Sequence, residues 1–225
     1  MDKFKHIDTW VFDLDNTLYD AATGVFNRIG DQMTLYVADQ LKVPVEEASR
    51  LRKHYWETYG TTLYGLMKEH KIDPHHFLHH AHQIDISDVP QCVITKEYLA
   101  RLPGKKVIFT NSSRAFAERM SRHLGIDHHF DHLFSIEDAN FLPKPRLEPY
   151  QEVLKKFNVD PKRAVMFEDM EINLKTAHDL GMTTVWVHGD NKNPDTHALP
   201  HLHHKAETLA DWLKKTVPQH PIKGK

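Results

Sequence analysis

The chain has 225 residues, more than one minimal hydrophobic core needs and fewer than two ordinary domains would use. It is 40% hydrophobic and 27% charged, with 29 Lys and Arg against 31 Asp and Glu and a net charge of −2. These values exclude a disordered chain, and they leave no basic surplus for binding a nucleic-acid polymer or an anionic membrane. A single cysteine, Cys92, excludes a disulfide framework and a cysteine-based zinc site.

The N-terminal sequence MDKFKHIDTW lacks the apolar segment of a secretory signal, and no stretch of the chain reaches about 18 uninterrupted apolar residues. We therefore expect a cytoplasmic protein without a membrane partner. We also expect it to be a monomer or a weak homodimer.

The first predicted element is a strand, Thr9–Phe12, because a short run of aromatic and β-branched residues suits a strand buried on both faces. No convincing strand follows over residues 21–90. The apolar residues there recur at spacings of three and four, the pattern of helices with one buried face. An interval this long is rarely a structureless loop, so we expect a small helical domain inserted after the first strand. Its helices are expected through Val25, Ile29, Met33, Tyr36 and Val37, and near 45–58, 61–70 and 74–82.

From about residue 104 onward, strands alternate with amphipathic helices, which predicts βαβ units and a parallel sheet with helices on both faces. We therefore predict an α/β fold: a doubly wound, Rossmann-like core of residues 1–20 and 91–225, with residues 21–90 as the inserted helical domain. The expected strands are Val107–Phe109, Ala164–Phe167 and Thr183–Val187, and the expected helices are Ser113–Leu124, Glu148–Phe157, Leu174–Leu180 and Ala206–Leu213.

Ligands of open α/β sheets bind outside the carboxyl ends of the strands, so the residues that follow the predicted strands are the informative ones. Four carboxylates gather there, together with hydroxyl and amide side chains, and a lysine flanked by prolines occurs farther along the chain. In chain order these residues are Asp13, Asp15, Thr110, Asn111, Lys144, Glu168 and Asp169.

Clustered carboxylates repel one another and take up protons unless a cation holds them. Oxygen ligands without cysteine favour a hard cation, and Mg²⁺, which also binds substrate phosphates, fits best. Asp13 and Asp15 can divide the work: one carboxylate attacks phosphorus while the other handles the proton of the leaving group. Thr110 and Lys144 would then hold the equatorial oxygens of the phosphoryl group.

Together these motifs resemble, in the same order and over nearly the whole chain, the four motifs of the haloacid dehalogenase-like hydrolases. The first corresponds to Asp13-Leu14-Asp15-Asn16-Thr17-Leu18 after a hydrophobic run. The second, third and fourth correspond to Thr110, Lys144 and the pair Glu168-Asp169. The resemblance implies an enzyme with an inserted cap that closes over a small substrate and excludes water.

The resemblance also implies the role of each carboxylate. Asp13 would be the nucleophile and Asp15 the general acid/base. Mg²⁺ would be held by the Asp13 carboxylate, the backbone carbonyl of Asp15 and Asp169, with Glu168 acting directly or through water. Because dehalogenating relatives lack an acid two residues after the nucleophile, Asp15 favours phosphoryl transfer over dehalogenation. Thr110, Lys144 and Asn111 are expected to bind the phosphate.

Within the predicted cap, Tyr59-Gly60-Thr61-Thr62-Leu63 and Asp73-Pro74-His75-His76-Phe77-Leu78 resemble the pyrimidine 5′-nucleotidase branch of the family. Three aromatic residues near the glycine turn can stack on a planar base, or they can simply pack the cap. These are Tyr55, Trp56 and Tyr59, and Tyr59 is the candidate substrate contact.

Three functions remain open. The first is a Mg²⁺-dependent phosphomonoesterase that hydrolyses nucleoside 5′-monophosphates, preferably pyrimidine ones, through an aspartyl-phosphate. The second is a phosphatase or phosphomutase for a small sugar phosphate. The third is a non-catalytic phospho-accepting receiver module, which combines the same residue types. Receiver modules are about half this length, lack a cap and carry the acceptor after the third strand.

Histidine is unusually frequent, with 19 residues, and this suggests a metal site. Pairs at i,i+4 within the densest group can chelate Zn²⁺ or Ni²⁺ on a helix. No cysteine lies nearby, and Asp73 is the one carboxylate that could complete a set. We therefore expect this group to be solvated surface, with the metal on aspartates instead. Its members are His75, His76, His79, His80 and His82.

Overall fold

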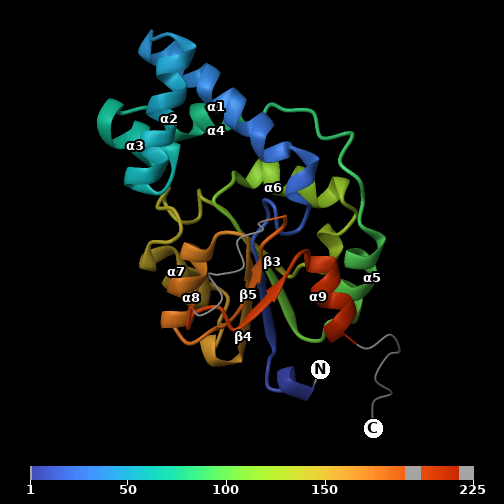
Figure 1. Cartoon of the computed structure of the whole chain (residues 1–225). Coiled ribbons are helices and arrows are strands. Elements are labelled where there is room, and N and C mark those ends of the chain that lie inside the picture. The colour runs from blue at the N-terminus through green and yellow to red at the C-terminus, as the bar shows by residue number, and fades with distance from the viewer. Residues whose placement is uncertain (1, 191–198, 218–225) are drawn as a thin grey trace.

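The computed structural model describes residues 2–190 and 199–217 of the chain. The strands of this part are β1 (Thr9–Phe12), β2 (Lys105–Phe109), β3 (His132–Phe134), β4 (Ala164–Glu168), β5 (Thr183–Val187) and β6 (His204–Ala206). They form one sheet in the order β3-β2-β1-β4-β5-β6, with every neighbouring pair parallel. Helices cover both faces of the sheet (Figure 1). The predicted doubly wound α/β fold is confirmed.

The α-helices of the described residues fall into an inserted group, α1–α4, and a group that flanks the sheet, α5–α9. Single turns of 3-10 helix occur at Asp2–Phe4, Ala21–Thr23, Asp127–His129 and Pro161–Arg163. The α-helices are α1 (Val25–Leu41), α2 (Val45–Tyr59), α3 (Thr62–His70), α4 (Pro74–Ala81), α5 (Val93–Arg101), α6 (Arg114–His123), α7 (Leu147–Lys156), α8 (Glu171–Asp179) and α9 (Leu209–Thr216).

The continuous apolar run of β1 is explained by its central position. The strand pairs with β2 on one side and β4 on the other, and all four of its residues are buried. Because successive side chains of a strand point to opposite faces, Trp10 and Phe12 pack with α5, α6 and α9, whereas Val11 packs with α7 and α8. A strand enclosed in this way has no solvent-facing side to place polar residues on.

Helices α1 to α4 pack on one another around a second hydrophobic cluster, which includes Tyr36, Tyr55 and Phe77 and, from the segment after β3, Ile136. Helix α1 links this cluster to the sheet, because Val25 and Ile29 in its first turns belong to the core beneath α5, α6 and α9. The division of the chain into a core of residues 1–20 and 91–225 and a cap of residues 21–90 stays a prediction, and residues 191–198 and 218–225 lie outside the described part.

Two strands and one α-helix were missing from the prediction. Strands β3 and β6 have three residues each, and both begin with a histidine, so neither shows an apolar run. Helix α5 leaves Val93 and Ile94 exposed, which blurs its amphipathic pattern. Helix α9 starts three residues later than expected, because Ala206 ends β6. No helix in residues 2–190 and 199–217 is long and apolar enough to cross a membrane.

Candidate active site

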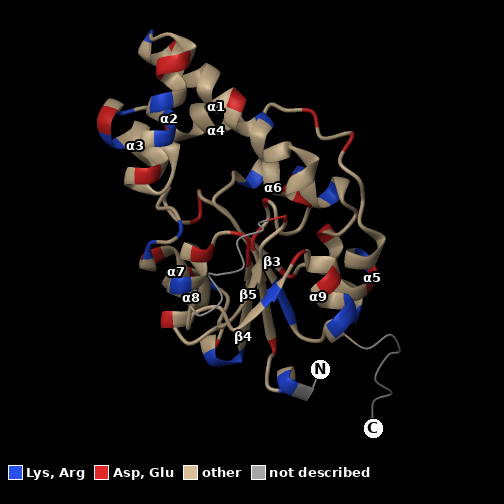
Figure 2. Cartoon of the chain, viewed as in Figure 1, with Lys and Arg blue, Asp and Glu red and all other residues tan. Residues whose placement is uncertain are grey.

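The predicted site residues meet where the central strands end. The backbone N–H of Asp13, directly after β1, donates to the carbonyl of Phe167 in β4 at 2.9 Å, and that of Thr110 donates to Phe134 in β3 at 3.0 Å. The parallel register therefore aligns the ends of β1, β2 and β4. Acidic segments, red in Figure 2, lie at these ends, on the side of the sheet that faces α1–α4.

Lys144 ties the nucleophile candidate to the fourth motif. Its ammonium donates to Asp13 Oδ1 and Glu168 Oε2, both at 2.7 Å, and to the backbone carbonyl of Phe109 at 3.0 Å. All three protons of the ammonium are therefore used, and only 1% of the side chain is exposed. Burial alone would lower the pKa of Lys144, but the two carboxylates raise it above its usual value.

Three carboxylates crowd this one lysine. Asp13, Glu168 and Asp169 each offer an oxygen, and these oxygens lie within 4.8 Å of one another. Burial and the charge of Glu168 raise the pKa of Asp13 well above its usual range, and the same two causes raise the pKa of Asp169 to about 8. Carboxyl groups show such raised pKa values when too little positive charge lies near them. A divalent cation among the three oxygens would supply that charge and favour the ionised carboxylates.

The donor set fits a hard, hydrated cation. It consists of carboxylate oxygens, and Asn16 lies beside it. The Nδ2 of Asn16 donates to Asp169 at 3.1 Å, and the buried Oδ1 of Asn16 is an acceptor without a partner among the described residues. Both oxygens of Glu168 already accept hydrogen bonds, from Lys144 and from the N–H of Met170 at 3.3 Å. Of the two arrangements predicted for Glu168, contact with the metal through water fits these bonds better.

Asp15 has different surroundings from Asp13. Its Oδ1 accepts from the hydroxyl of Tyr19 at 2.5 Å, and its Oδ2 accepts from Ser112 at 2.7 Å and from Thr110 at 3.4 Å. Burial raises the pKa of Asp15, and the hydrogen bonds from Ser112 and Tyr19 work against that rise. The general acid/base candidate is thus held by hydroxyls, whereas the nucleophile candidate is held by a lysine.

Asn111 fixes the loop that carries the lysine. Its side-chain oxygen accepts from the backbone N–H of Lys144 at 2.9 Å, and its amide donates to the Lys144 carbonyl at 3.3 Å. The structure therefore places Asn111 next to the phosphate-binding candidates, with its amide turned to the backbone of the loop. Its contact with phosphate stays a prediction.

The turn between α2 and α3 lies against the same loop. Gly60 has φ +90°, a conformation that favours glycine, and a Cβ there would stand 3.6 Å from the carbonyl oxygen of Lys144. Tyr59 is half-buried next to this turn, its hydroxyl donates to Glu69, and its ring centroid lies 6.3 Å from that of Tyr55. Tyr59 thus immediately precedes the glycine that lies against the lysine loop, and its contact with substrate stays a prediction.

The histidine group on α4 does not assemble as a metal site. Among the described residues, Asp13, Glu168 and Asp169 form the one set of His, Cys or acidic ligands close enough to share an ion. One member also differs from the expected solvated surface: His82 is buried, stacks on Phe116 with ring centroids 4.7 Å apart, and has Nδ1 3.0 Å from the hydroxyl of Ser113. Burial lowers the pKa of His82 to about 4.

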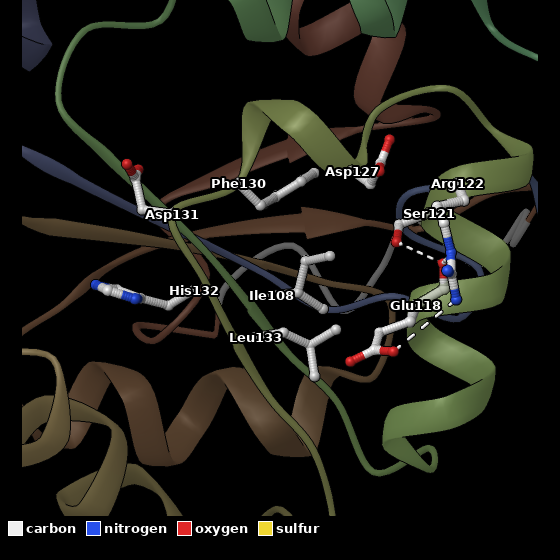
Figure 3. A pocket seen from close by; sticks show the side chains of 9 residues that line it. All are labelled: Ile108, Glu118, Ser121, Arg122, Asp127, Phe130, Asp131, His132 and Leu133. Atoms are coloured by element: carbon white, nitrogen blue, oxygen red, sulfur yellow. Dashed lines mark hydrogen bonds and ion pairs between the residues drawn. The ribbon is translucent and has the colours of Figure 1, made fainter.

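A surface pocket of about 310 Å³ lies away from these residues, beside α6 and strands β2 and β3 (Figure 3). Ile108, Phe130 and Leu133 line it together with charged side chains, and Arg122 points toward Glu118 in the close-up. None of the residues predicted for the site lines this pocket. The candidate active site is therefore at the strand ends and not in this pocket.

Three residues in contact with the site were absent from the predicted set. Tyr19 and Ser112 donate to Asp15, and Asn16 donates to Asp169. Each lies within four residues of a predicted one, so proximity in the chain was the available signal. The signal is weak, because the contacts depend on a turn in which Asn16 has φ +57°.

Comparison with known proteins identifies the family. The sequence pattern described as haloacid dehalogenase-like hydrolase matches residues 7–181, most of the chain. The chain therefore belongs to the haloacid dehalogenase-like hydrolases, as its four motifs predict. The pyrimidine 5′-nucleotidase branch is not singled out by this match.

The relatives in sequence include several phosphatases. The chain is 29% identical over 189 residues to phosphate metabolism protein 8 of Saccharomyces cerevisiae, which covers 76% of this chain and 58% of the yeast protein. It is 29% identical over 199 residues to the glyceraldehyde 3-phosphate phosphatase of Pyrococcus abyssi, with 78% and 79% covered. It is 28% identical over 102 residues to the fructose-1-phosphate phosphatase YqaB of Escherichia coli, with 45% and 53% covered. The chain thus spans less than two thirds of the yeast and E. coli proteins.

Solved structures agree on the fold. A haloacid dehalogenase-like phosphatase from Thermococcus onnurineus superposes with a TM-score of 0.63 at 18% identity, over 93% of this chain and 97% of the other. The crystal structure of a dehalogenase gives 0.62 at 17% identity, over 95% and 99%. Likeness at such identities shows the fold alone, so the reaction has to be argued from the site.

Proposed function

We propose that the protein is a Mg²⁺-dependent phosphomonoesterase that hydrolyses nucleoside 5′-monophosphates, preferably pyrimidine ones, through an aspartyl-phosphate. One observation carries the proposal: a buried and a half-buried carboxylate two residues apart, the first held by an ammonium and the second by hydroxyls. A nucleophile must stay ionised, and Lys144 favours that state of Asp13. A general acid/base must gain and lose a proton, and the partners of Asp15 permit both.

The first half-reaction follows from these positions. Asp13 Oδ1 is occupied by Lys144, and Oδ2, which accepts no hydrogen bond from the described residues, is the oxygen that attacks phosphorus. As its bond to phosphorus forms, the bond from phosphorus to the 5′ oxygen breaks, and Asp15 donates a proton to that oxygen. Lys144 and Thr110 offset the charge that develops on the phosphoryl oxygens.

The second half-reaction returns the enzyme to its starting state. Asp15, now ionised, takes a proton from water while the water oxygen attacks the phosphorus of the aspartyl-phosphate. The bond between phosphorus and Asp13 breaks and inorganic phosphate leaves. Mg²⁺, held by Asp13, Asp169 and the backbone carbonyl of Asp15, with Glu168 through water, would supply positive charge for the phosphate.

Dehalogenation is the rival reaction on the same fold. It replaces a carbon–halogen bond, so its leaving group is a halide that needs no proton. A half-buried acid two residues from the nucleophile therefore has no leaving group to protonate in that reaction. In phosphomonoester hydrolysis the alkoxide needs a proton and the attacking water must lose one, so Asp15 is required twice.

The second candidate function is hydrolysis, or phosphomutation, of a small sugar phosphate. The names of the P. abyssi and E. coli relatives, glyceraldehyde 3-phosphate phosphatase and fructose-1-phosphate phosphatase, favour it. The aromatic residues beside the Gly60 turn favour a nucleotide instead, because their faces can stack on a base. Both functions share the same chemistry at Asp13 and Asp15 and differ in what the helical insertion contacts.

A phosphate-release screen tests the proposal. The purified protein is incubated with Mg²⁺ and with ribo- and deoxyribonucleoside 5′-monophosphates, glyceraldehyde 3-phosphate and fructose 1-phosphate, and kcat/KM is measured for each. We expect the highest value for a pyrimidine nucleotide. A profile led by sugar phosphates would replace the nucleotidase by the second candidate, and no phosphate release from any ester would refute the phosphomonoesterase.

A further inference from the structure

The two catalytic candidates are held by opposite kinds of partner. Asp13 is bound by Lys144, whose ammonium can only donate hydrogen bonds. Asp15 is bound on one oxygen by Tyr19 at 2.5 Å and on the other by Ser112 at 2.7 Å. A hydroxyl can donate to a carboxylate and, after rotation, accept from a carboxylic acid. Its partner can therefore change protonation state without losing the contact.

We infer that Tyr19 and Ser112 are positioning residues that hold the carboxyl group of Asp15 in place while it transfers its proton to the leaving oxygen. The inference rests on the proposed function and adds two residues to it. Neither hydroxyl touches phosphorus or the phosphoryl oxygens in the proposed reaction. They act through Asp15, because Tyr19 holds one of its carboxyl oxygens and Ser112 the other.

The local fold explains how Tyr19 reaches back to Asp15. Leu18 donates its N–H to the carbonyl of Leu14 at 2.9 Å, and Asn16 has φ +57°, so the chain turns tightly after the first motif. Tyr19 then lies with its ring in the hydrophobic core, 5% exposed, with its hydroxyl turned to the site. The phenol is thus fixed by packing and brings its one polar atom to the carboxylate.

Ser112 is fixed independently, by the loop after β2. Its backbone N–H donates to the hydroxyl of Thr110 at 2.9 Å, and its carbonyl accepts from Ile136 at 3.2 Å. The side chain is buried, so water does not compete for the hydroxyl. The Asp15 carboxyl is therefore clamped between a turn of the first motif and a loop of the second, which are far apart in the chain.

Leaving-group dependence separates this role from general damage. An alkyl phosphomonoester such as a nucleoside 5′-monophosphate needs the proton from Asp15, whereas p-nitrophenyl phosphate releases a much weaker base that departs without it. The informative quantity is kcat/KM, because it covers the steps up to release of the alcohol and not the later hydrolysis of the aspartyl-phosphate. Both esters are measured with the wild type and with Tyr19→Phe and Ser112→Ala.

We expect each variant to lose about tenfold or more in kcat/KM for the nucleotide and less than about threefold for p-nitrophenyl phosphate. Tyr36→Phe and Ser121→Ala are the matched controls, since both hydroxyls are buried or half-buried and hydrogen-bonded away from the site, to His76 and to the carbonyl of Glu118. The controls should leave both values near the wild type, and thermal unfolding shows whether each variant folds.

The outcomes are distinct. An equal loss on both esters, or no loss on either, in a folded Tyr19→Phe or Ser112→Ala protein would overturn the inference and leave the phosphomonoesterase in place. A wild type that hydrolyses neither ester would overturn the proposed function, and the inference with it. If Ser112→Ala does not fold, Ser112→Thr is measured instead, because it keeps the hydroxyl. A folded Ser112→Thr protein that lost about tenfold in kcat/KM for the nucleotide alone would contradict the role of the hydroxyl.

Discussion

The ends of the strands and the inserted helices use their polar groups in opposite ways. At the strand ends, charges are enclosed: Asp13 is 5% exposed, Glu168 is 1% exposed, and both share the ammonium of Lys144. Burying charge costs free energy unless the charge is paired, so a buried cluster of charges indicates a functional role more than a stabilising one.

In the inserted helices, buried tyrosine hydroxyls pair with imidazoles of exposed histidines. Tyr36 lies 2.8 Å from His76 and Tyr55 lies 2.6 Å from His70, while Trp56 leaves 45% of its surface exposed. These contacts stabilise the insertion and perform no chemistry. In the proposed function the reaction takes place at the strand ends, and we expect the insertion to contribute only to substrate selection. Substitutions in the two regions should therefore fail in different ways.

Asp13→Asn should have the largest effect. It removes the attacking oxygen's charge, so we expect kcat to fall by about 10³-fold or more on every phosphomonoester. The fold should persist, because the change relieves repulsion among the buried carboxylates. Phosphate release and thermal unfolding are measured beside Asp31→Asn, an exposed position on α1. Activity near that of the wild type would remove Asp13 as the nucleophile.

Asp169→Asn tests the proposed metal site at the same strand ends. Loss of one charged ligand should raise the Mg²⁺ concentration needed for half-maximal activity by about 10- to 100-fold. The chain keeps its fold and, at saturating Mg²⁺, part of its activity. Titration of activity with Mg²⁺ after treatment with EDTA measures the shift. Full activity of the wild type in EDTA would contradict the metal assignment.

His82, where the end of α4 packs on α6, gives a prediction for stability instead of activity. Burial lowers the pKa of His82 from its usual 6.5 to about 4, so between these pH values the unfolded chain binds a proton that the folded protein does not. The contribution of His82 to the free energy of unfolding is therefore complete above about pH 6.5 and decreases as the pH falls toward 4. At pH 5 the decrease is about 2 kcal/mol.

Urea unfolding at pH 7.5 and pH 5 measures this loss for the wild type and for His82→Gln. The variant should be less stable at pH 7.5, because the stacking on Phe116 is lost, and its stability should change less between the two pH values. His79→Gln, an exposed neighbour on α4, is the control and should keep the pH dependence of the wild type. An identical dependence in His82→Gln would show that other groups cause it.

The sequence predicted the long buried strands and the acids that follow them, but not the short edge strands or the contacts between distant elements. The strands β1, β2, β4 and β5 and the acids behind them are readable, because a strand buried on both faces is apolar throughout and its first polar residue marks the site. Strands β3 and β6 lie at or near the sheet edges with three residues each, too short for a pattern. The burial of His82 depends on Phe116, a residue of another element, and no local pattern reports it.

The Tyr19 contact was also beyond local pattern. A tyrosine four residues after Asp15 is visible in the sequence, but the turn that carries its hydroxyl back requires φ +57° at Asn16. Asparagine adopts this conformation more readily than most residues, without being confined to it. Tyr19 could therefore be identified as the partner of Asp15 only from the folded structure.

Substitution of Tyr59 has the smallest expected effect and tests whether the inserted helices select the substrate. Tyr59 precedes Gly60, which lies against the loop of Lys144; its ring lies near Tyr55 and Tyr64, and its hydroxyl is already bound to Glu69. Any contact with substrate must therefore come from the aromatic face. We expect Tyr59→Leu to raise KM for a pyrimidine nucleotide about fivefold, with kcat nearly unchanged and KM for a sugar phosphate unaffected.

The matched variant is Tyr59→Phe, which keeps the ring and loses only the bond to Glu69. It should bind the nucleotide as the wild type does. If both variants raised KM equally for both substrate classes, the ring would serve only to pack the insertion, and the base would have to be recognised elsewhere. The exposed Trp56, earlier on α2, would then be the next aromatic residue to substitute, because it has free surface to offer.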